Sequence, residues 1–146
     1  MEIKVTKAFP EAKLPTYGSE QAAGMDLYAH LDEGSICIPP HCTAKISAGF
    51  SMAIPNGYFG AVFARSGLAT RQGLRPANCT GVIDSDYRGI VMVALRNDSD
   101  VSRFINHGDR IAQLVILPCM QAELVESESL DETERGEGGF GSTGTK

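Results

Sequence analysis

Short apolar segments separated by turn-forming residues make up most of this chain, and this pattern constrains its fold more than any other feature. Strands of this length and spacing are typical of sandwiches and barrels, so the pattern predicts an all-β fold. The expected strands are Ile3–Val5, Ile36–Ile38, Thr43–Ala48, Phe50–Ile54, Tyr58–Phe63, Ile90–Leu95, Val101–Ile105 and Ile111–Leu117. The expected turns are Pro39-Pro40, Pro55-Asn56-Gly57, Asn97-Asp98-Ser99 and His107-Gly108-Asp109.

One helix and a change of composition near the C-terminus complete the predicted organisation. Ser66–Gln72 is the one segment that fits a helical period, as about two turns after a serine cap. The 146 residues suit a single domain, and we expect residues 1–120 to form its packed body. We expect residues 121–146 to form a mobile arm, because seven acidic side chains and one basic side chain in Gln121–Glu137 precede a glycine-rich end. A disordered solubilising tail would have a similar composition.

The charge of the chain favours a small anionic ligand over a nucleic-acid polymer. The net charge is −5 and no basic run occurs, which argues against direct binding of nucleic acid. Eight of the thirteen cationic side chains are arginines, whose planar guanidinium can grip a phosphate through two hydrogen bonds. No apolar run approaches the roughly 20 residues of a membrane-spanning helix, and Met1–Pro10 lacks the pattern of a secretion signal. We therefore expect a cytoplasmic protein, or one in the cytoplasm or nucleus of a host cell if the source is a virus.

The cysteines and histidines give no sign of a metal site. Zinc sites usually contain close cysteine pairs or histidines at short spacing, and neither occurs among the four cysteines and three histidines. A disulfide between Cys37 and Cys42 is compatible with their separation, but reduced thiols are the favoured interpretation. His30, His41 and His107 lie in turn-like surroundings, so we expect them at the surface.

The segment Gly81–Gly89, with the sequence GVIDSDYRG, combines features of a ligand site. Its terminal glycines suggest a β-hairpin tip whose backbone can approach a ligand closely. Asp84 follows two β-branched residues, and a carboxylate in that position can accept a proton from water. The alternative is that Asp84 only caps the turn through its side chain.

Three other segments carry weaker signals. Arg65-Ser66-Gly67 leads into the expected helix, where free N–H groups, a hydroxyl and an arginine suit an anion, although a simple helix cap explains them equally well. In Gly108–Ile116 the alternation places Arg110 on one face of a strand and Ile111 on the other. Ala23–Leu27 suggests a bend at its glycine with one buried acid.

Five motifs in a fixed order give these weak signals a common explanation. They are GMDL at 24–27, RSGL at 65–68, GVIDSDYRG at 81–89, GDRIAQL at 108–114 and RGEGGFGSTG at 135–144. In this order they resemble the five motifs of the trimeric deoxyuridine triphosphate nucleotidohydrolases (dUTPases), over nearly the whole chain from about Ala22 to Gly144.

The resemblance implies a β jelly roll that assembles as a homotrimer, in which the arm of one subunit closes a site formed by the other two. It implies hydrolysis of dUTP to dUMP and pyrophosphate by water attack on the α-phosphorus, which limits uracil incorporation into DNA and supplies dUMP for thymidylate synthesis. Mg²⁺ is the implied cofactor. It is held mainly by phosphate oxygens and water, so no protein ligand to it is expected.

The resemblance also implies roles for individual residues. Asp84 corresponds to the base that deprotonates the attacking water, and Tyr87 would lie under the deoxyribose and exclude a 2′-hydroxyl. The uracil would be read by Asn78, Val82, Ile83 and Met92, and the phosphates would be bound by Arg65, Ser66, Gly67 and Gln113. The arm would bring Arg135, Ser142 and Thr143 to the γ-phosphate. It would also stack Phe140 on the uracil and provide Gly141 as a further substrate contact. Asp26 and Arg110 are expected to pair with each other behind the substrate.

Two alternatives share this fold. A dCTP deaminase would need a glutamate for chemistry at C4 and would not require the phenylalanine of the arm. A non-catalytic relative would bind dUTP and signal to a protein partner, but the chain retains the catalytic residues and has no inserted segment. The departures from the family pattern are small: Ala64 replaces a frequent proline, and Cys79 is a thiol near the expected base site.

Overall fold

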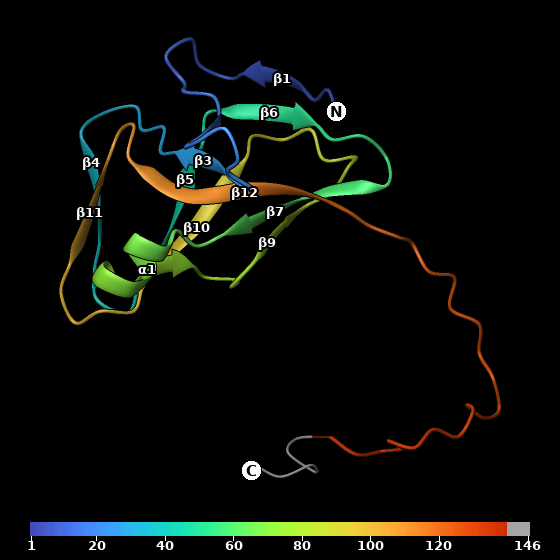
Figure 1. Ribbon diagram of the computed structural model, residues 1–146. Helices are drawn as coiled ribbons and strands as arrows, with labels where there is room; N and C mark the ends of the chain where they lie inside the picture. The colour runs from blue at the N-terminus through green and yellow to red at the C-terminus, as the bar shows by residue number, and fades with distance from the viewer. Residues whose placement is uncertain (140–146) are drawn as a thin grey trace.

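The computed structural model describes residues 1–139, which form twelve strands and one short helix (Figure 1). The helix α1 comprises Ser66–Gln72. The strands are β1 (Lys4–Lys7), β2 (Thr16–Tyr17), β3 (Met25–Tyr28), β4 (Ser35–Ile38), β5 (Thr43–Ser47), β6 (Phe50–Ala53), β7 (Tyr58–Phe63), β8 (Leu74–Pro76), β9 (Gly81–Ile83), β10 (Met92–Asn97), β11 (Arg103–Asn106) and β12 (Arg110–Pro118).

The strands pair into small antiparallel sheets around one core. The largest sheet has the order β2-β3-β12-β7-β9, and a second has the order β5-β10-β8. Two further pairs, β1-β6 and β11-β4, complete the described sheets. The prediction of an all-β fold of short strands with one short helix is confirmed.

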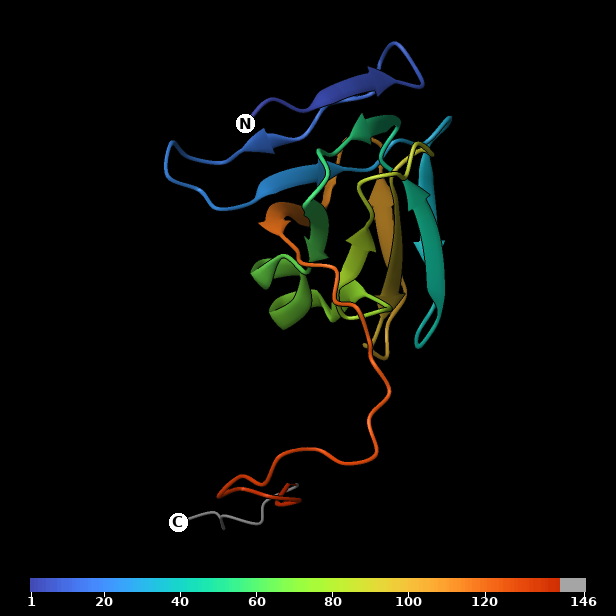
Figure 2. The same ribbon diagram turned by 90° about the vertical axis from the view of Figure 1, so that its right-hand side faces the viewer.

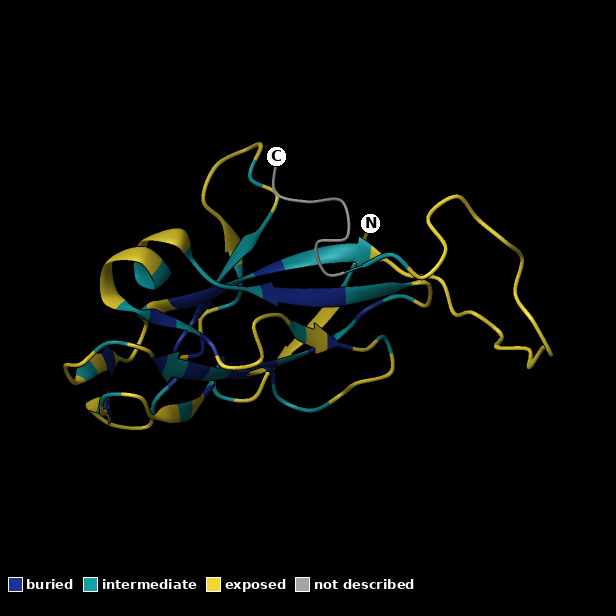
Figure 3. Cartoon of the chain, turned by 90° about the horizontal axis from the view of Figure 1, so that it is seen from below, coloured by how far each residue is buried: buried dark blue, intermediate teal, exposed yellow. Residues whose placement is uncertain are grey.

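Alternating side chains of the longest strand, β12, show how the core is built. Ile111 is buried where the pairing register shifts between Arg110 and Ala112; after this shift Ala112 and Leu114, two residues apart, share the face toward the core. These two residues join Leu27, Ile46 and Leu95 from three other strands in one apolar cluster. Figure 3 shows the buried residues gathered along the inner strands of the body.

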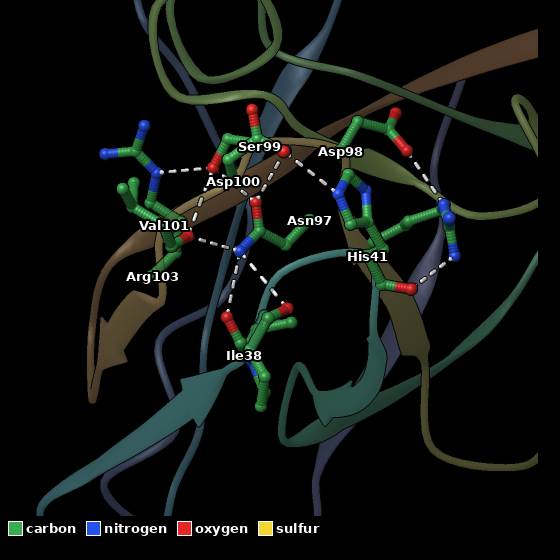
Figure 4. Close-up of polar contacts among 10 residues, drawn as sticks. Ile38, His41, Asn97, Asp98, Ser99, Asp100, Val101 and Arg103 are labelled. Atoms are coloured by element: carbon green, nitrogen blue, oxygen red, sulfur yellow. Dashed lines mark hydrogen bonds and ion pairs between the residues drawn. The ribbon is translucent and has the colours of Figure 1, made fainter.

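Asn97 is a buried polar hub at the end of β10 (Figure 4). Its amide nitrogen donates to the carbonyl oxygens of Ile38 (2.9 Å), Pro39 (3.2 Å) and Val101 (2.8 Å). Its side-chain oxygen accepts hydrogen bonds from the backbone N–H (3.0 Å) and hydroxyl (2.7 Å) of Ser99. One side chain thus ties β10 to the ends of two loops, whereas the sequence pattern placed it in a simple turn.

Of three predictions about local structure, two were wrong. Gly81–Gly89 is not a hairpin tip, because β9 pairs with β7 while β10 pairs with β5 and β8. The bend expected in Ala23–Leu27 is confirmed at Ala23 and Gly24, directly before the strand β3, which pairs with both β2 and β12. The residue that caps α1 is Arg65 rather than Ser66, and no side chain makes the capping hydrogen bond.

The expected surface position of His30 was also wrong. The residue is buried, stacks on Phe9 with ring centroids 4.2 Å apart, and meets the edge of His107 at 5.2 Å. Among residues 1–139, neither ring nitrogen finds a hydrogen-bond partner. The cysteines, in contrast, are exposed free thiols, as favoured from the sequence.

Beyond β12 the described chain leaves the body and runs alongside no strand of it (Figures 1 and 2). Residues 119–137 are exposed, and Met120, Leu124 and Leu130 are 97%, 95% and 88% exposed. Large apolar side chains in this position have no covering surface within the described part of the chain. Among residues 1–139, no helix has the length and apolar character needed to cross a membrane.

Candidate active site

A pocket of about 320 Å³ collects several of the residues expected at the base site. Asn78, Tyr87 and Met92 line it together with Gly81. A Cβ at Gly81 would lie 3.1 Å from Cβ of Val62 and 3.5 Å from the amide nitrogen of Asn78, so the glycine leaves room for that amide. We call this space the Asn78 pocket. It presents one amide, one aromatic ring and one thioether, the mixture of polar and apolar groups that a small planar ligand needs.

The tyrosine of this pocket is held by its own loop. Its hydroxyl donates to the carbonyl oxygen of Ile90 at 3.0 Å, and the ring lies where a Cβ of residue 89 would be, so Gly89 is required for the close approach. The Tyr87 side chain remains partly exposed beside Met92. The ring therefore has a fixed position while one face stays accessible.

Val82 and Ile83 do not line the Asn78 pocket with their side chains. Val82 is exposed and Ile83 is packed into the core. Both residues pair with β7 on one side, and β9 is an edge strand of its sheet. Only their backbone groups on the open edge are thus placed to meet a ligand, since a strand turns its unpaired N–H and C=O groups to its free edge.

A second group of predicted residues surrounds the start of α1, and we call it the Arg65 cluster. Its cavity of about 420 Å³ is lined by Asp26, Arg65, Ser66, Gly67, Leu68, Arg71, Gln72 and Gln113. Asp26 accepts from Arg65 Nε at 2.8 Å and from Arg110 Nη1 at 3.2 Å, so both carboxylate oxygens face guanidinium groups. Gln113 donates to the carbonyl oxygen of Ala64 at 3.0 Å, which holds its amide beside the helix start. The cluster carries excess positive charge and suits an anion.

Asp84 lies in neither of these places. It is exposed and lines a third cavity, of about 790 Å³, with Asp86, Arg88 and Cys119. Tyr87 N–H donates to the backbone carbonyl of Asp84 at 3.2 Å, and Arg88 donates to the Ser85 carbonyl at 2.7 Å. The turn is thus closed by backbone acceptors, and no contact of the Asp84 side chain caps it within the described residues.

The predicted site is therefore divided within one chain. The Asn78 pocket, the Arg65 cluster and the Asp84 cavity share no lining residue. Arg135, in the arm, donates to the carbonyl oxygen of Gly138 and lines none of them. Phe140, Gly141, Ser142 and Thr143 lie outside the described residues.

Two cationic lining residues were missed from the sequence. Arg71 lies on α1 and adds a second cation to the Arg65 cluster, and its place four residues after Gly67, on the same face of the helix, was the available signal. Lys45 lines the Asn78 pocket because β5 pairs with β10, with Lys45 opposite Ala94. That pairing joins segments far apart in the sequence, so no local signal marks Lys45.

Residues 1–139 hold no group of three or more His, Cys, Asp or Glu side chains that could bind a metal ion. The one carboxylate of the Arg65 cluster, Asp26, already faces two arginines. Hard cations such as Mg²⁺ prefer several oxygen ligands, including water and phosphate. A divalent ion near this cluster would therefore be bound mainly by oxygens of an anionic ligand.

Comparison with known proteins identifies the family. Residues 10–144 match the family model described as dUTPase. The deoxyuridine 5'-triphosphate nucleotidohydrolase of Syntrophotalea carbinolica is 49% identical over 142 residues, which cover 97% of this chain and 96% of that protein.

Two solved structures extend the comparison. A dUTPase variant of Staphylococcus bacteriophage 80alpha, with dUpNHpp, has a TM-score of 0.89 at 28% identity and covers 98% of each chain. A dUTPase variant from phage phi11 of S. aureus, described with a structural Mg(II) ion, has a TM-score of 0.78 at 26% identity and covers 88% of this chain and 98% of that one. The family model, the relatives and the fold agree: this chain belongs to the dUTPase family.

Proposed function

We propose that the protein is a dUTP diphosphatase that hydrolyses dUTP to dUMP and pyrophosphate. The observation that carries this proposal is the Asn78 pocket, which combines an amide and an accessible tyrosine ring beside the edge strand β9. The chain that forms this pocket belongs to the dUTPase family. The relatives are named for the same reaction, and the phage 80alpha structure contains a dUTP analogue.

Recognition of uracil follows from the polar groups of the Asn78 pocket. The edge of uracil offers one N–H donor between two carbonyl acceptors. The Asn78 amide and the open-edge backbone of Val82 and Ile83 together supply acceptors and donors for it. Cytosine reverses part of this pattern and would leave buried polar groups unpaired, which gives strong discrimination. Met92 closes the apolar side, and Tyr87 lies where a deoxyribose would stack and a 2′-hydroxyl would collide.

The triphosphate would bind at the Arg65 cluster. Ser66 and Gly67 offer a hydroxyl and N–H groups at the start of α1, while Gln113 and Arg65 add side-chain donors. Asp26 and Arg110 hold Arg65 in place rather than contact the substrate. Mg²⁺ would arrive with the triphosphate and supply further neutralisation of its charge.

The division of the site within one chain supports a homotrimer. The Asp84 turn of one subunit would face the Arg65 cluster of the next, and the arm of a third would cover both. We divide the chain accordingly into a body of residues 1–120 and an arm of residues 121–146. The arm brings Arg135, Ser142 and Thr143 to the γ-phosphate, with Phe140 on the uracil and Gly141 as a further contact. An obligate assembly of this kind is typical of symmetric oligomers with shared sites.

In the reaction Asp84 accepts a proton from water while the water oxygen forms a bond to the α-phosphorus. The bond between that phosphorus and the oxygen of the β-phosphate breaks, and pyrophosphate leaves with the electron pair. The arginines stabilise the charge that builds on the leaving group, and positioning supplies most of the rate. Closure of the arm removes water and strengthens these contacts.

A product assay with dUTP, dCTP, UTP and dTTP in the presence of Mg²⁺ tests the proposal. We expect dUMP and pyrophosphate from dUTP and little turnover of the other three. Release of ammonia from dCTP would instead indicate a deaminase. Asp84→Asn should abolish turnover and still bind dUpNHpp, whereas Asp100→Asn, an equal charge change at an exposed carboxylate beside His41, should remain active. Normal pyrophosphate release by Asp84→Asn would refute the role of the base.

A further inference from the structure

The turn that carries Asn78 has a conformation that needs support from its surroundings. Cys79 has φ of +61°, in the left-handed region that residues with a side chain seldom adopt. Inside the turn, Cys79 N–H donates to the Pro76 carbonyl at 3.1 Å, and Thr80 N–H donates to the Asn78 carbonyl at 2.6 Å. These local bonds define the turn, and the Ala77 N–H, which donates to the Ala94 carbonyl at 2.7 Å, attaches its first half to β10.

Arg75 adds a side-chain attachment that reaches the second half of the turn. Its Nη1 donates to the carbonyl oxygen of Pro76 at 3.2 Å and lies 3.8 Å from Sγ of Cys79. The guanidinium therefore contacts Pro76 and Cys79, the first and fourth residues of the turn. Asn78 lies between these two residues, so a shift of Arg75 would move the backbone that carries the Asn78 amide.

The guanidinium of Arg75 is itself fixed by Asp98. Its Nε donates to one oxygen of Asp98 at 2.6 Å, and Nε of Arg96 donates to the other oxygen at 2.7 Å. Arg75 and Arg96 lie directly opposite each other on β8 and β10, where like charges repel, so the carboxylate between them is required. Figure 4 shows Asp98 beside the Asn97 hub, which anchors this end of β10.

The same carboxylate residue links the arrangement to the helix. The backbone N–H of Asp98 donates to the Gly73 carbonyl at 2.8 Å, directly after α1. All three charged side chains are about one-third exposed, at 36% for Arg75, 37% for Asp98 and 35% for Arg96. Several partners therefore set the positions of these side chains, and water only partly screens the attraction between their charges.

We propose that Arg75 is a positioning residue for base recognition: held by Asp98, it fixes the turn from Pro76 to Thr80 and so sets the place of Asn78 in the pocket. It does not touch the substrate. The inference rests on the proposed function, since it assigns a base to the Asn78 pocket. It predicts that loss of Arg75 weakens binding and base choice while the chemical step is spared.

The test compares Arg75→Ala with Arg96→Ala in the full-length protein. Both variants remove one arginine from the same carboxylate, but Arg96 contacts the His41 carbonyl rather than the turn. For Arg75→Ala we expect KM for dUTP to rise about tenfold with kcat within about twofold, the effect of losing one hydrogen bond from a charged donor. The preference for dUTP over dCTP should fall by a similar factor. Arg96→Ala should change KM less than about twofold. An unchanged KM in Arg75→Ala, or an equal rise in Arg96→Ala, would overturn the proposal.

A third variant, Arg75→Lys, covers the case in which Arg75→Ala does not fold. Lysine keeps the ion pair with Asp98 but lacks the planar fork that also reaches the Pro76 carbonyl, so KM should still rise. Wild-type KM in Arg75→Lys would show that only the charge matters and would overturn the positioning role. Calorimetry of dUpNHpp binding, which needs no turnover, tests the positioning role of Arg75 separately from the proposed hydrolysis of dUTP. A wild-type protein that binds this probe but does not hydrolyse dUTP would refute the proposed function, while the variants still test Arg75.

Discussion

Asn97→Ala should destabilise the protein by about 2–4 kcal/mol. The substitution leaves the buried carbonyl of Ile38 without its donor, at a cost of about 1–3 kcal/mol, and removes the acceptor of Ser99 N–H, worth about 0.5–1.5 kcal/mol. The part-buried carbonyls of Pro39 and Val101 can meet water and should add little. With total stabilities of about 5–15 kcal/mol, the loss is a large fraction. For a chain of this length it corresponds to a fall in Tm of roughly 6–12 °C.

Thermal and urea unfolding at one fixed protein concentration measure this loss, because the stability of an oligomer depends on concentration. Ser99→Ala is the matched control: it removes only a hydroxyl and keeps the backbone N–H bond to Asn97, so it should cost less than about 1 kcal/mol. Asn97→Asp should be worse than Asn97→Ala, since it places an acceptor, and a charge, against three carbonyls. The hub interpretation is refuted if Asn97→Ala unfolds within about 1 kcal/mol of the wild type with an unchanged urea slope.

Three further predictions concern charge, packing and metal. Burial alone would raise the pKa of Asp98, but hydrogen bonds from Arg96 and Arg75 outweigh it and hold this pKa below its ordinary value of 3.8. Because this pKa is lowered in the folded state, the ionised Asp98 stabilises the fold at pH values above its ordinary pKa. The Tm difference between wild type and Asp98→Asn should therefore be constant at pH 5–7 and shrink below about pH 4. A Tm difference that stays undiminished to pH 2.5 would contradict this. Gly24→Ala places a Cβ 3.0 Å from Oε1 of Gln113, so KM for dUTP should rise about threefold with little change in Tm, whereas unchanged kinetics would remove Gln113 from phosphate binding. Chelation of divalent ions should abolish turnover and added Mg²⁺ should restore it, without the change in Tm expected of a structural metal.

The strands most easily predicted were those whose pattern is local. Tyr58–Phe63 was predicted with its observed bounds, and the alternation after Gly108 placed Arg110 and Ile111 on the correct faces. Leu74–Pro76 was missed because it is short and contains an arginine and a proline, and it forms by pairing with the distant β10. Pairing across the fold, rather than composition, makes it a strand.

The chemistry of the site was easier to predict than its arrangement. The resemblance to the family implied a role for Asn78, Tyr87 and Met92 at the base, and these three residues line one pocket. The sequence could not indicate that Asn97 is buried, because asparagine is common in turns and its role here depends on carbonyls of two segments distant in the sequence, Ile38-Pro39 and Val101. Arg75 was missed for the same reason: its partner Asp98 directly follows β10, a strand that meets β8 only in the folded protein.

The central claim is that one active site uses residues of different subunits, and a subunit-mixing experiment tests it most directly. Asp84→Asn in the full-length chain and a wild-type chain ending at Glu134 should each be inactive alone. Unfolded together at equal amounts and refolded, they should form mixed trimers in about three quarters of cases, each with one complete site in three. We predict recovery of about one quarter of wild-type dUTP turnover in the mixture. A mixture as inactive as its two parents would contradict the shared site.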